Sequence, residues 1–373
     1  MNNTDKTFNA FFALLRAGLW ETEVRHEPFG VVDFEALLQL AEEQSVVGLI
    51  VAGIEHIADT KPQKKDVLQF IGRTVQLEQR NQAMNYFIGV LVEKMREAGI
   101  TVLLVKGQGV AQCYERPLWR SCGDVDFLLD EENFGKALEY LTPLAQHVDR
   151  EESYSRHIGM TIDPWIVELH GSLRCGLSVR MDKGIDGLQE DCFLKGNVRT
   201  WANGETSVFL PGEDNDILFI FTHFLKHFYK GGIGLRQICD WCRLLWTYRE
   251  QIDVVLLEKR LKAMGLISEW KAFGAFAVVY LGMPVEAMPL YSADAKWKCK
   301  AARISSFIME VGNFGHNRDT SYYSKYPFLV RKTISMGWRI GDLFRHARIF
   351  PLDSLRFFPK LMYDGVRSAV KGE

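Results

Sequence analysis

The sequence of 373 residues is 47% hydrophobic and 25% charged, which is typical of a globular protein and is long enough for two or three structural units. Its net charge of −2 argues against a protein that binds nucleic acid through bulk charge. Seven irregularly spaced cysteines do not suggest a disulfide framework, the first residues lack the features of a signal peptide, and no apolar run reaches the length of a membrane span, so we expect reduced thiols and a cytoplasmic protein.

The first 98 residues are predicted to form an N-terminal helical region. Apolar residues in 34–49 recur at helical spacing, and Asp33 is the expected N-cap. A long amphipathic stretch follows over 66–98, with Gly99 as its expected C-terminal stop.

Residues 99–200 are predicted to form a small α/β core. Strands are predicted at 100–107, 123–130, 147–153, 155–162 and 165–173. Helices are predicted over 109–115 and over 131–144, and Asp130 is the expected cap of the second. This order predicts an α+β protein in which a small mixed sheet is flanked by helical regions.

Residues 201–373 are predicted to form a C-terminal helical region. Helices are expected over 213–230, 234–250 and 256–281. The tail 325–373 carries ten Lys/Arg against four Asp/Glu, interleaved with aromatic residues. Such a tail is either a core-facing aromatic stripe with a solvated basic side, or a surface for peripheral contact with a membrane or with nucleic acid.

Two aspartates lie two residues apart in the second predicted strand. Because alternate residues of a strand share a face, Asp124 and Asp126 point to one side, while Val125 and Phe127 point toward a core. Paired carboxylates repel each other, and a hard cation that prefers oxygen ligands, Mg²⁺ or Mn²⁺, would relieve that repulsion. Gly123, just before the pair, allows a phosphate or another backbone to approach closely.

A third carboxylate lies on the last predicted strand. Glu168 alternates with the apolar residues Trp165, Val167 and Leu169, so it faces away from the core. If this strand pairs beside the strand of the two aspartates, three carboxylates converge. Two-metal phosphoryl transfer requires such a set, with the ions about 4 Å apart.

The segment 103–138 resembles the core of the uncharacterised nucleotidyltransferase family within the DNA polymerase β-like superfamily. The residues that carry the resemblance are Lys106, Gly107, Arg120, Asp124 and Asp126, with Glu168 matching the third acid. Glu168 to His170 also resemble the family's acid-Leu-His element. The resemblance implies a nucleotidyltransferase in which Asp124, Asp126 and Glu168 are catalytic metal ligands, and Glu168 is also a candidate general base.

The resemblance also indicates which residues bind the nucleotide. Many enzymes of the superfamily have Gly-Ser at the turn after the first strand, whereas here Gly107 is followed by Gln108 and Gly109. Backbone amides of such a turn still bind phosphate, and Lys106 and Arg120 supply positive charge. The predicted phosphate contacts are Lys106, Gly107, Gln108, Arg120 and Gly123.

Polar residues on later elements are candidate substrate contacts. His223 and His227 are one helical turn apart and share a face, which packs against the sheet or borders the cleft. Arg236 and Asp240 either orient the substrate or pair with each other. The candidate contacts are His170, His223, Lys226, His227, Arg236 and Asp240.

The predicted reaction is attack by an acceptor hydroxyl on the α-phosphate of a nucleoside triphosphate such as ATP, with pyrophosphate leaving. A small-molecule acceptor is favoured, because the near-neutral chain does not suggest a nucleic-acid substrate. Two alternatives stay open. One is a toxin-like enzyme that modifies a tRNA or a protein, and the other is a non-catalytic nucleotide-binding protein with the same fold.

Overall fold

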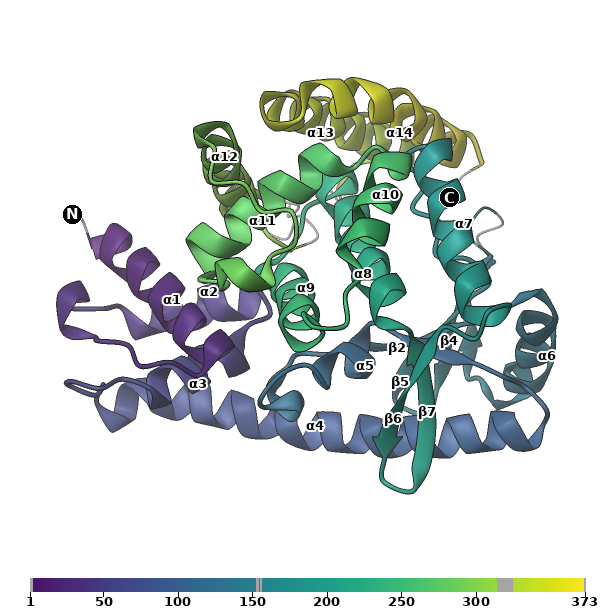
Figure 1. Ribbon diagram of the computed structural model, residues 1–373, viewed down its shortest axis with the longest axis horizontal. Helices are drawn as coiled ribbons and strands as arrows, with labels where there is room; N and C mark the ends of the chain where they lie inside the picture. The colour runs from purple at the N-terminus through teal and green to yellow at the C-terminus, as the bar shows by residue number, and fades with distance from the viewer. Residues whose placement is uncertain (1–2, 152–153, 155, 314–324, 372–373) are drawn as a thin grey trace.

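Figure 1 shows the computed structural model, which describes residues 3–151, 154, 156–313 and 325–371. The N-terminal helices are α1 (Asn3–Trp20), α2 (Phe34–Glu43), α3 (Val47–Glu55) and α4 (Lys64–Glu97), with a 3-10 helix η1 (Glu27–Phe29). Asp33 caps α2 by accepting from the backbone amides of Glu35 and Ala36, and Gly99 ends α4 with a φ of 71°. The predicted helical region and both predicted helix ends are therefore confirmed.

The 34-residue helix α4 runs along one side of the molecule (Figure 1). At about 1.5 Å per residue it spans about 50 Å. Midway along it, Asn81 is fully buried, and its side-chain amide donates to the backbone carbonyls of Leu118 (2.7 Å) and Arg120 (2.8 Å). This helix therefore fixes the loop that leads into the strand of the two aspartates.

A five-stranded mixed sheet forms the centre of the chain. Its strands are β1 (Leu103–Val105), β2 (Asp124–Leu128), β3 (His147–Val148), β4 (His157–Ile162) and β5 (Trp165–His170), in the order β1-β2-β5-β4-β3. The β2–β5 pair is parallel, and the other pairs are antiparallel. The strands lie within the predicted segments, and the α+β architecture with helical flanks is confirmed.

The two faces of the sheet differ in character. Val125, Phe127 and Val167 are buried in a hydrophobic cluster with residues of α4 and of α6 (Glu131–Leu141). Asp130 caps α6 as predicted, by accepting from the backbone amide of Asn133, and a 3-10 helix η3 (Thr142–Leu144) follows. The opposite face of β2, β5 and β4 carries the polar residues of the candidate site.

Helix α5 (Gly107–Ala111) begins and ends earlier than the predicted helix over 109–115. Proline restricts the residue before it to extended conformations, and Arg116 has a φ of −124° before the 3-10 helix η2 (Pro117–Trp119). The chain therefore leaves the helical conformation well before residue 117.

Between residues 173 and 211 the structure contains a helix and a two-stranded hairpin that the sequence pattern does not predict. Helix α7 (Val179–Phe193) contains Gly184 and Gly187, which lower its intrinsic helix propensity. Strands β6 (Val198–Asn203) and β7 (Thr206–Pro211) form a hairpin that packs on β1 and α4. Packing against the rest of the molecule stabilises these elements, and local sequence does not reveal that packing.

The C-terminal region is helical, as predicted. Its helices are α8 (Glu213–Lys230), α9 (Leu235–Thr247), α10 (Val254–Met264), α11 (Ile267–Leu281), α12 (Ala295–Val311), α13 (Phe328–Ile349) and α14 (Pro351–Lys371), with a 3-10 helix η4 (Val285–Ala287). Phe221 of α8 packs against Trp241 of α9 and Trp270 of α11, with ring centroids 5.3 and 4.8 Å away. This aromatic core fixes α8 and α9 relative to each other. The division of the chain at residues 98 and 200 stays a prediction.

Helices α13 and α14 form an outer layer of the molecule, drawn in yellow in Figure 1. Phe344, Leu352, Leu355 and Tyr363 are each at least 65% exposed there. The tail therefore presents apolar side chains to solvent as well as to the core, and its contact with a membrane or with nucleic acid stays a prediction. Within the residues that the structure describes, none of the helices combines the length and the apolar character that crossing a membrane requires.

Candidate active site

Three carboxylates meet on the polar face of the sheet. In the parallel β2–β5 pair, Asp126 lies beside Glu168, and Asp124 is two residues before Asp126 on the same face. Ligand oxygens of the three side chains lie within 4.8 Å of one another. The strand of Glu168 thus lies beside the strand of the two aspartates, as the three-carboxylate hypothesis requires.

Lys106 places a positive charge inside this cluster. It follows β1 with a φ of 58°, a left-handed conformation that non-glycine residues rarely adopt, and its Nζ donates to Asp126 Oδ1 at 2.5 Å. Burial lowers the pKa of Lys106, but the charges of Asp126 and Glu168 outweigh burial and raise that pKa above its ordinary value. Lys106 is therefore charged and partly neutralises the carboxylates.

The three carboxyl groups differ in pKa. The neighbouring charge of Asp126, followed by burial, raises the pKa of Asp124. Burial also raises the pKa of Asp126, but the charge of Lys106 and a hydrogen bond from His170 lower it overall. For Glu168, burial is outweighed by hydrogen bonds from His157 and His170, which hold its pKa well below the ordinary value. Asp126 and Glu168 are thus ionised at neutral pH.

Two histidines lie against these carboxylates. His170 Nε2 lies 2.8 Å from Asp126 Oδ1 and 3.4 Å from Glu168 Oε2, and His157 Nε2 lies 3.1 Å from Glu168 Oε2. His170 was a candidate substrate contact, whereas the sequence pattern alone does not single out His157. The two-residue connection at 163–164 could have identified His157, because a turn of that length places His157 opposite His170 in the hairpin.

Helices α8 and α9 supply the facing wall of the cleft. His223, Lys226 and His227 of α8 and Arg236 of α9 line the same cavity as the carboxylates. His223 and His227 contact each other through their Nε2 atoms at 3.1 Å. Burial, together with nearby cations such as Lys106 and Lys226, lowers the pKa of His223 well below its ordinary value and that of His227 to about 3, so both rings are neutral at pH 7.

Arg120 and Asp240 form a buried ion pair at the inner end of the cleft. Arg120 donates to both carboxylate oxygens of Asp240, at 3.0 and 2.7 Å, and Tyr114 donates to Asp240 at 2.8 Å. Arg236 also lies 3.9 Å from Asp240. Arg120 therefore connects the loop before β2 to α9, and both Arg120 and Asp240 line the cavity.

Two of the predicted phosphate contacts lie outside the cavity lining. Gln108 is buried, and its side chain donates to Asn81 of α4 at 2.8 Å rather than pointing to the carboxylates. Gly123 is exposed, and it is not among the residues that line the cavity. Gly107 does line it, with a φ of 41° that favours glycine. The geometry therefore does not support a phosphate contact by the side chain of Gln108.

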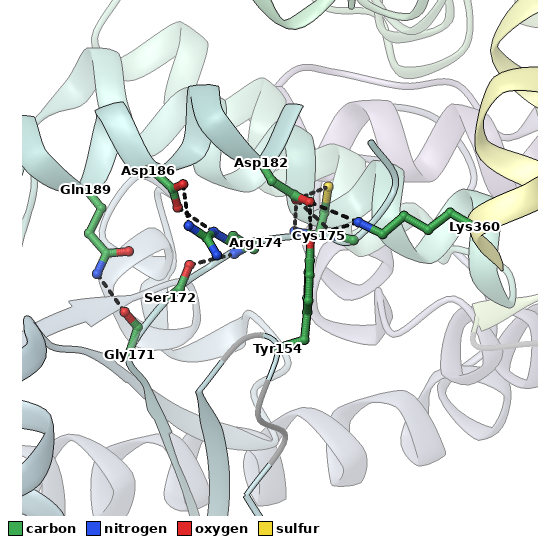
Figure 2. Close-up of polar contacts among 10 residues, drawn as sticks. Tyr154, Gly171, Ser172, Arg174, Cys175, Asp182, Asp186, Gln189 and Lys360 are labelled. Atoms are coloured by element: carbon green, nitrogen blue, oxygen red, sulfur yellow. Dashed lines mark hydrogen bonds and ion pairs between the residues drawn. The ribbon is translucent and has the colours of Figure 1, made fainter. Parts of the chain in front are cut away.

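The loop after β5 forms the rim of the cleft. Ser172, Leu173 and Arg174 line the cavity, although no sequence pattern singles them out. Figure 2 shows that Arg174 is bidentate to Asp186 of α7, with distances of 2.7 and 2.6 Å. The charge of Arg174 is thus partly compensated, and the rim is tied to α7.

Helix α14 contacts residues next to this rim. In Figure 2, Lys360 reaches Tyr154 and Asp182, and its Nζ donates to the Tyr154 hydroxyl at 2.7 Å and lies 3.3 Å from Asp182. Asp182 also accepts from the backbone amide of Cys175 at 3.0 Å, so it fixes the chain just after the rim. The outer helical layer is therefore joined to the segment that follows the cleft lining.

The cleft has a volume of about 300 Å³. Its sheet side carries carboxylates and imidazoles, and its helical side carries cations and neutral imidazoles. Such an arrangement can hold a divalent cation on one side and an anionic substrate on the other.

Comparison of the chain with curated proteins and with solved structures finds no match. A family model described as an uncharacterised nucleotidyltransferase matches residues 31–279, which is more than half of the chain. The matched residues include the carboxylate strands as well as α8 and α9, which face them across the cleft. The chain therefore belongs to the uncharacterised nucleotidyltransferase family.

Proposed function

We propose that this protein transfers a nucleoside monophosphate from a nucleoside triphosphate, such as ATP, to a hydroxyl group of a small molecule. The observation that carries the proposal is that one cleft of about 300 Å³ combines three converging carboxylates with cationic side chains from the facing helices. Membership of a nucleotidyltransferase family supports the same reaction class.

The carboxylate cluster fits a divalent cation such as Mg²⁺ or Mn²⁺. Asp124, Asp126 and Glu168 offer only oxygen ligands, and their spread of at most 4.8 Å is close to the span of about 4 Å between opposite ligands of one Mg²⁺. When bound, such cations neutralise the charge that develops on the transferred phosphate. The low pKa of Glu168 makes it a poor proton acceptor, which favours a role as metal ligand over that of general base.

The cationic side chains suit a triphosphate. Arg120 Nη1 and Arg236 Nε are buried, and neither has a hydrogen-bond partner among the residues described. A buried donor without a partner is costly, so an anionic group within the cavity would be a favourable partner for these guanidinium groups. Lys226 adds a third cation on the same wall.

In the proposed reaction, the acceptor oxygen forms a bond to the α-phosphorus and the bond to the β-phosphate oxygen breaks. Pyrophosphate leaves, and the hydroxyl proton is released. This chain's contribution is to hold both substrates in line and to supply a preorganised charged environment.

The first test is metal-dependent nucleotide binding, measured by thermal unfolding with each nucleoside triphosphate and Mg²⁺. A ligand at about 100 times its Kd stabilises the folded state by about 2.7 kcal/mol. We expect stabilisation that requires Mg²⁺ and is lost in Asp126→Ala, while Glu139→Gln, which removes an exposed carboxylate of α6, behaves as wild type. An absent shift with every nucleotide at millimolar concentration would refute the proposal.

The second test separates the acceptor classes. The protein is incubated with α-³²P-labelled nucleotides and either a small-metabolite extract, tRNA or total protein. We expect label in the small-molecule fraction. Label in tRNA or protein would instead establish a macromolecular acceptor, and nucleotide binding without any transfer would indicate a non-catalytic binding protein.

A further inference from the structure

Two histidines and one glutamate share one face of the antiparallel β4–β5 pair. His157 lies directly opposite His170, and Glu168 is two residues before His170 on the same strand. Because alternate residues of paired strands point the same way, the three side chains project together from the sheet. The arrangement follows from the hairpin register.

The distances in this group are compatible with three ligands around one ion. His157 Nε2 and His170 Nε2 lie 3.1 and 3.4 Å from the same oxygen, Glu168 Oε2. Two ligands about 2.0–2.1 Å from a tetrahedral ion are about 3.3 Å apart, which both distances match. Without an ion, the same two rings hydrogen-bond Glu168, and His170 Nε2 also lies 2.8 Å from Asp126 Oδ1. One ligand atom from each of the three residues lies within 4.8 Å of the others.

The chemistry of the group differs from that of the aspartate pair. Imidazole nitrogen is a preferred ligand of Zn²⁺ and of other transition-metal ions, while Mg²⁺ prefers oxygen. Two histidines and a glutamate are also a ligand set of catalytic zinc, which leaves at least one coordination position open. His157 and Glu168 each have about a quarter of their side chain exposed, and both line the cleft.

We propose that His157, Glu168 and His170 form a second cation site, which takes a transition-metal ion such as Zn²⁺. Glu168 would be shared with the carboxylate cluster, so the two sites would lie side by side. Because the three residues line the cleft, an open position of the ion would be accessible there to an oxygen of the acceptor or of water. The inference goes beyond the proposed function and does not depend on nucleotide transfer.

The test measures metal binding without nucleotide. Full-length protein is stripped with a chelator and titrated calorimetrically with Zn²⁺ in the presence of excess Mg²⁺, which competes for oxygen ligands. His157→Gln keeps a donor to Glu168 but removes the imidazole. The matched control, Asp124→Asn, weakens the carboxylate cluster and leaves all three proposed ligands in place.

We expect the wild type and Asp124→Asn to bind Zn²⁺ alike. His157→Gln should lose more than about 100-fold in affinity, because losing a direct ligand exceeds the usual effect of losing an outer partner. Co²⁺ bound to the wild type should show the intense visible absorption of nitrogen-ligated, four- or five-coordinate cobalt. Circular dichroism of the metal-free variants checks that they fold.

Three outcomes would overturn the site: no Zn²⁺ binding by the wild type, unchanged binding by His157→Gln, or equal loss in both variants. If His157→Gln does not fold, the Co²⁺ spectrum of the wild type decides, since the weak absorption of six-coordinate cobalt would contradict the proposed four- or five-coordinate site. Loss of nucleotide transfer alone would leave the inference intact, because none of these measurements uses nucleotide.

Discussion

Lys106 places its ammonium group against Asp126, which is also a ligand of the proposed metal ion. Its Nζ is 2.5 Å from Asp126, and its left-handed backbone, which costs about 1–3 kcal/mol in a non-glycine residue, is held by the surrounding structure. The lysine thus keeps the carboxylate ionised and paired before any metal binds. A bound cation and Lys106 would share the same carboxylate.

Lys106→Gln is therefore expected to destabilise the protein most strongly when metal is absent. Removing one partner of a buried ion pair costs about 3–5 kcal/mol, and Asp126 would keep its hydrogen bond with His170. Mg²⁺ should restore part of the loss, which urea unfolding with and without Mg²⁺ would measure. An equal loss of unfolding free energy with and without Mg²⁺ would show that Lys106 stabilises the backbone turn and does not compensate for the absent metal.

The side chains of the candidate site were predictable where strand alternation decides their direction. Asp124, Asp126 and Glu168 follow from that rule once their strands pair. Arg120 was predicted to contact phosphate, yet two of its nitrogens bind Asp240, 120 residues away, and no local pattern indicates such a partner. Gln108 turned toward α4 for the same reason, because its partner Asn81 lies on another element.

At the scale of elements, strong periodicity predicted the helices on both sides of the sheet. The position of β5 between β2 and β4 could not be derived in that way, because strand order depends on pairing between segments far apart in the chain. Helix α7 and the β6–β7 hairpin were not predicted, because their local sequence signals are weak. Glycines weaken the local signal of α7, and no residue of β6 is buried, so this strand lacks a clear apolar face.

The histidine pair of α8 predicts a loss of stability in acid. The pKa of His227 is about 3 in the folded protein, below its unfolded value of about 6.5. The unfolded chain thus binds the proton first, and stability falls as pH drops below about 6.5. The shift of His227 should lower the free energy of unfolding by about 2 kcal/mol at pH 5.

Urea unfolding between pH 7.5 and 5 tests this expectation. His227→Gln should flatten the dependence of the unfolding free energy on pH, because glutamine takes up no proton. His147→Gln, which removes a histidine whose side chain is 70% exposed, should leave the dependence unchanged. A slope that is the same in all three proteins would contradict the neutral state of the His227 ring.

At the scale of the whole molecule, the outer layer of α13 and α14 presents an apolar and basic surface. Phe344, Leu352 and Leu355 are exposed beside Arg348 and Arg356. Side chains of this kind suit the interface of an anionic membrane, where apolar groups enter and arginines meet lipid phosphates. Lys360 connects the same layer to the segment after the cleft rim.

Binding to vesicles of anionic phospholipid is therefore expected, and sedimentation would measure it. Leu355→Glu should weaken binding at least about tenfold, since burying a leucine contributes about 1.5–3 kcal/mol. Val255→Glu, at an exposed position of α10, is the matched control. If anionic vesicles bind neither the wild type nor Val255→Glu, the surface of α13 and α14 is simply solvated.

The parallel pairing of β2 and β5 also has a kinetic consequence. Asp126 and Glu168 lie side by side on strands that are far apart in the chain, so the ligands of the carboxylate cluster come together only after a long loop has closed. A cation cannot therefore gather these side chains early in folding, because the unfolded chain offers no preformed cage. Mg²⁺ at the carboxylate cluster and nucleotide should leave the refolding rate nearly unchanged and should instead lengthen the lifetime of the native state.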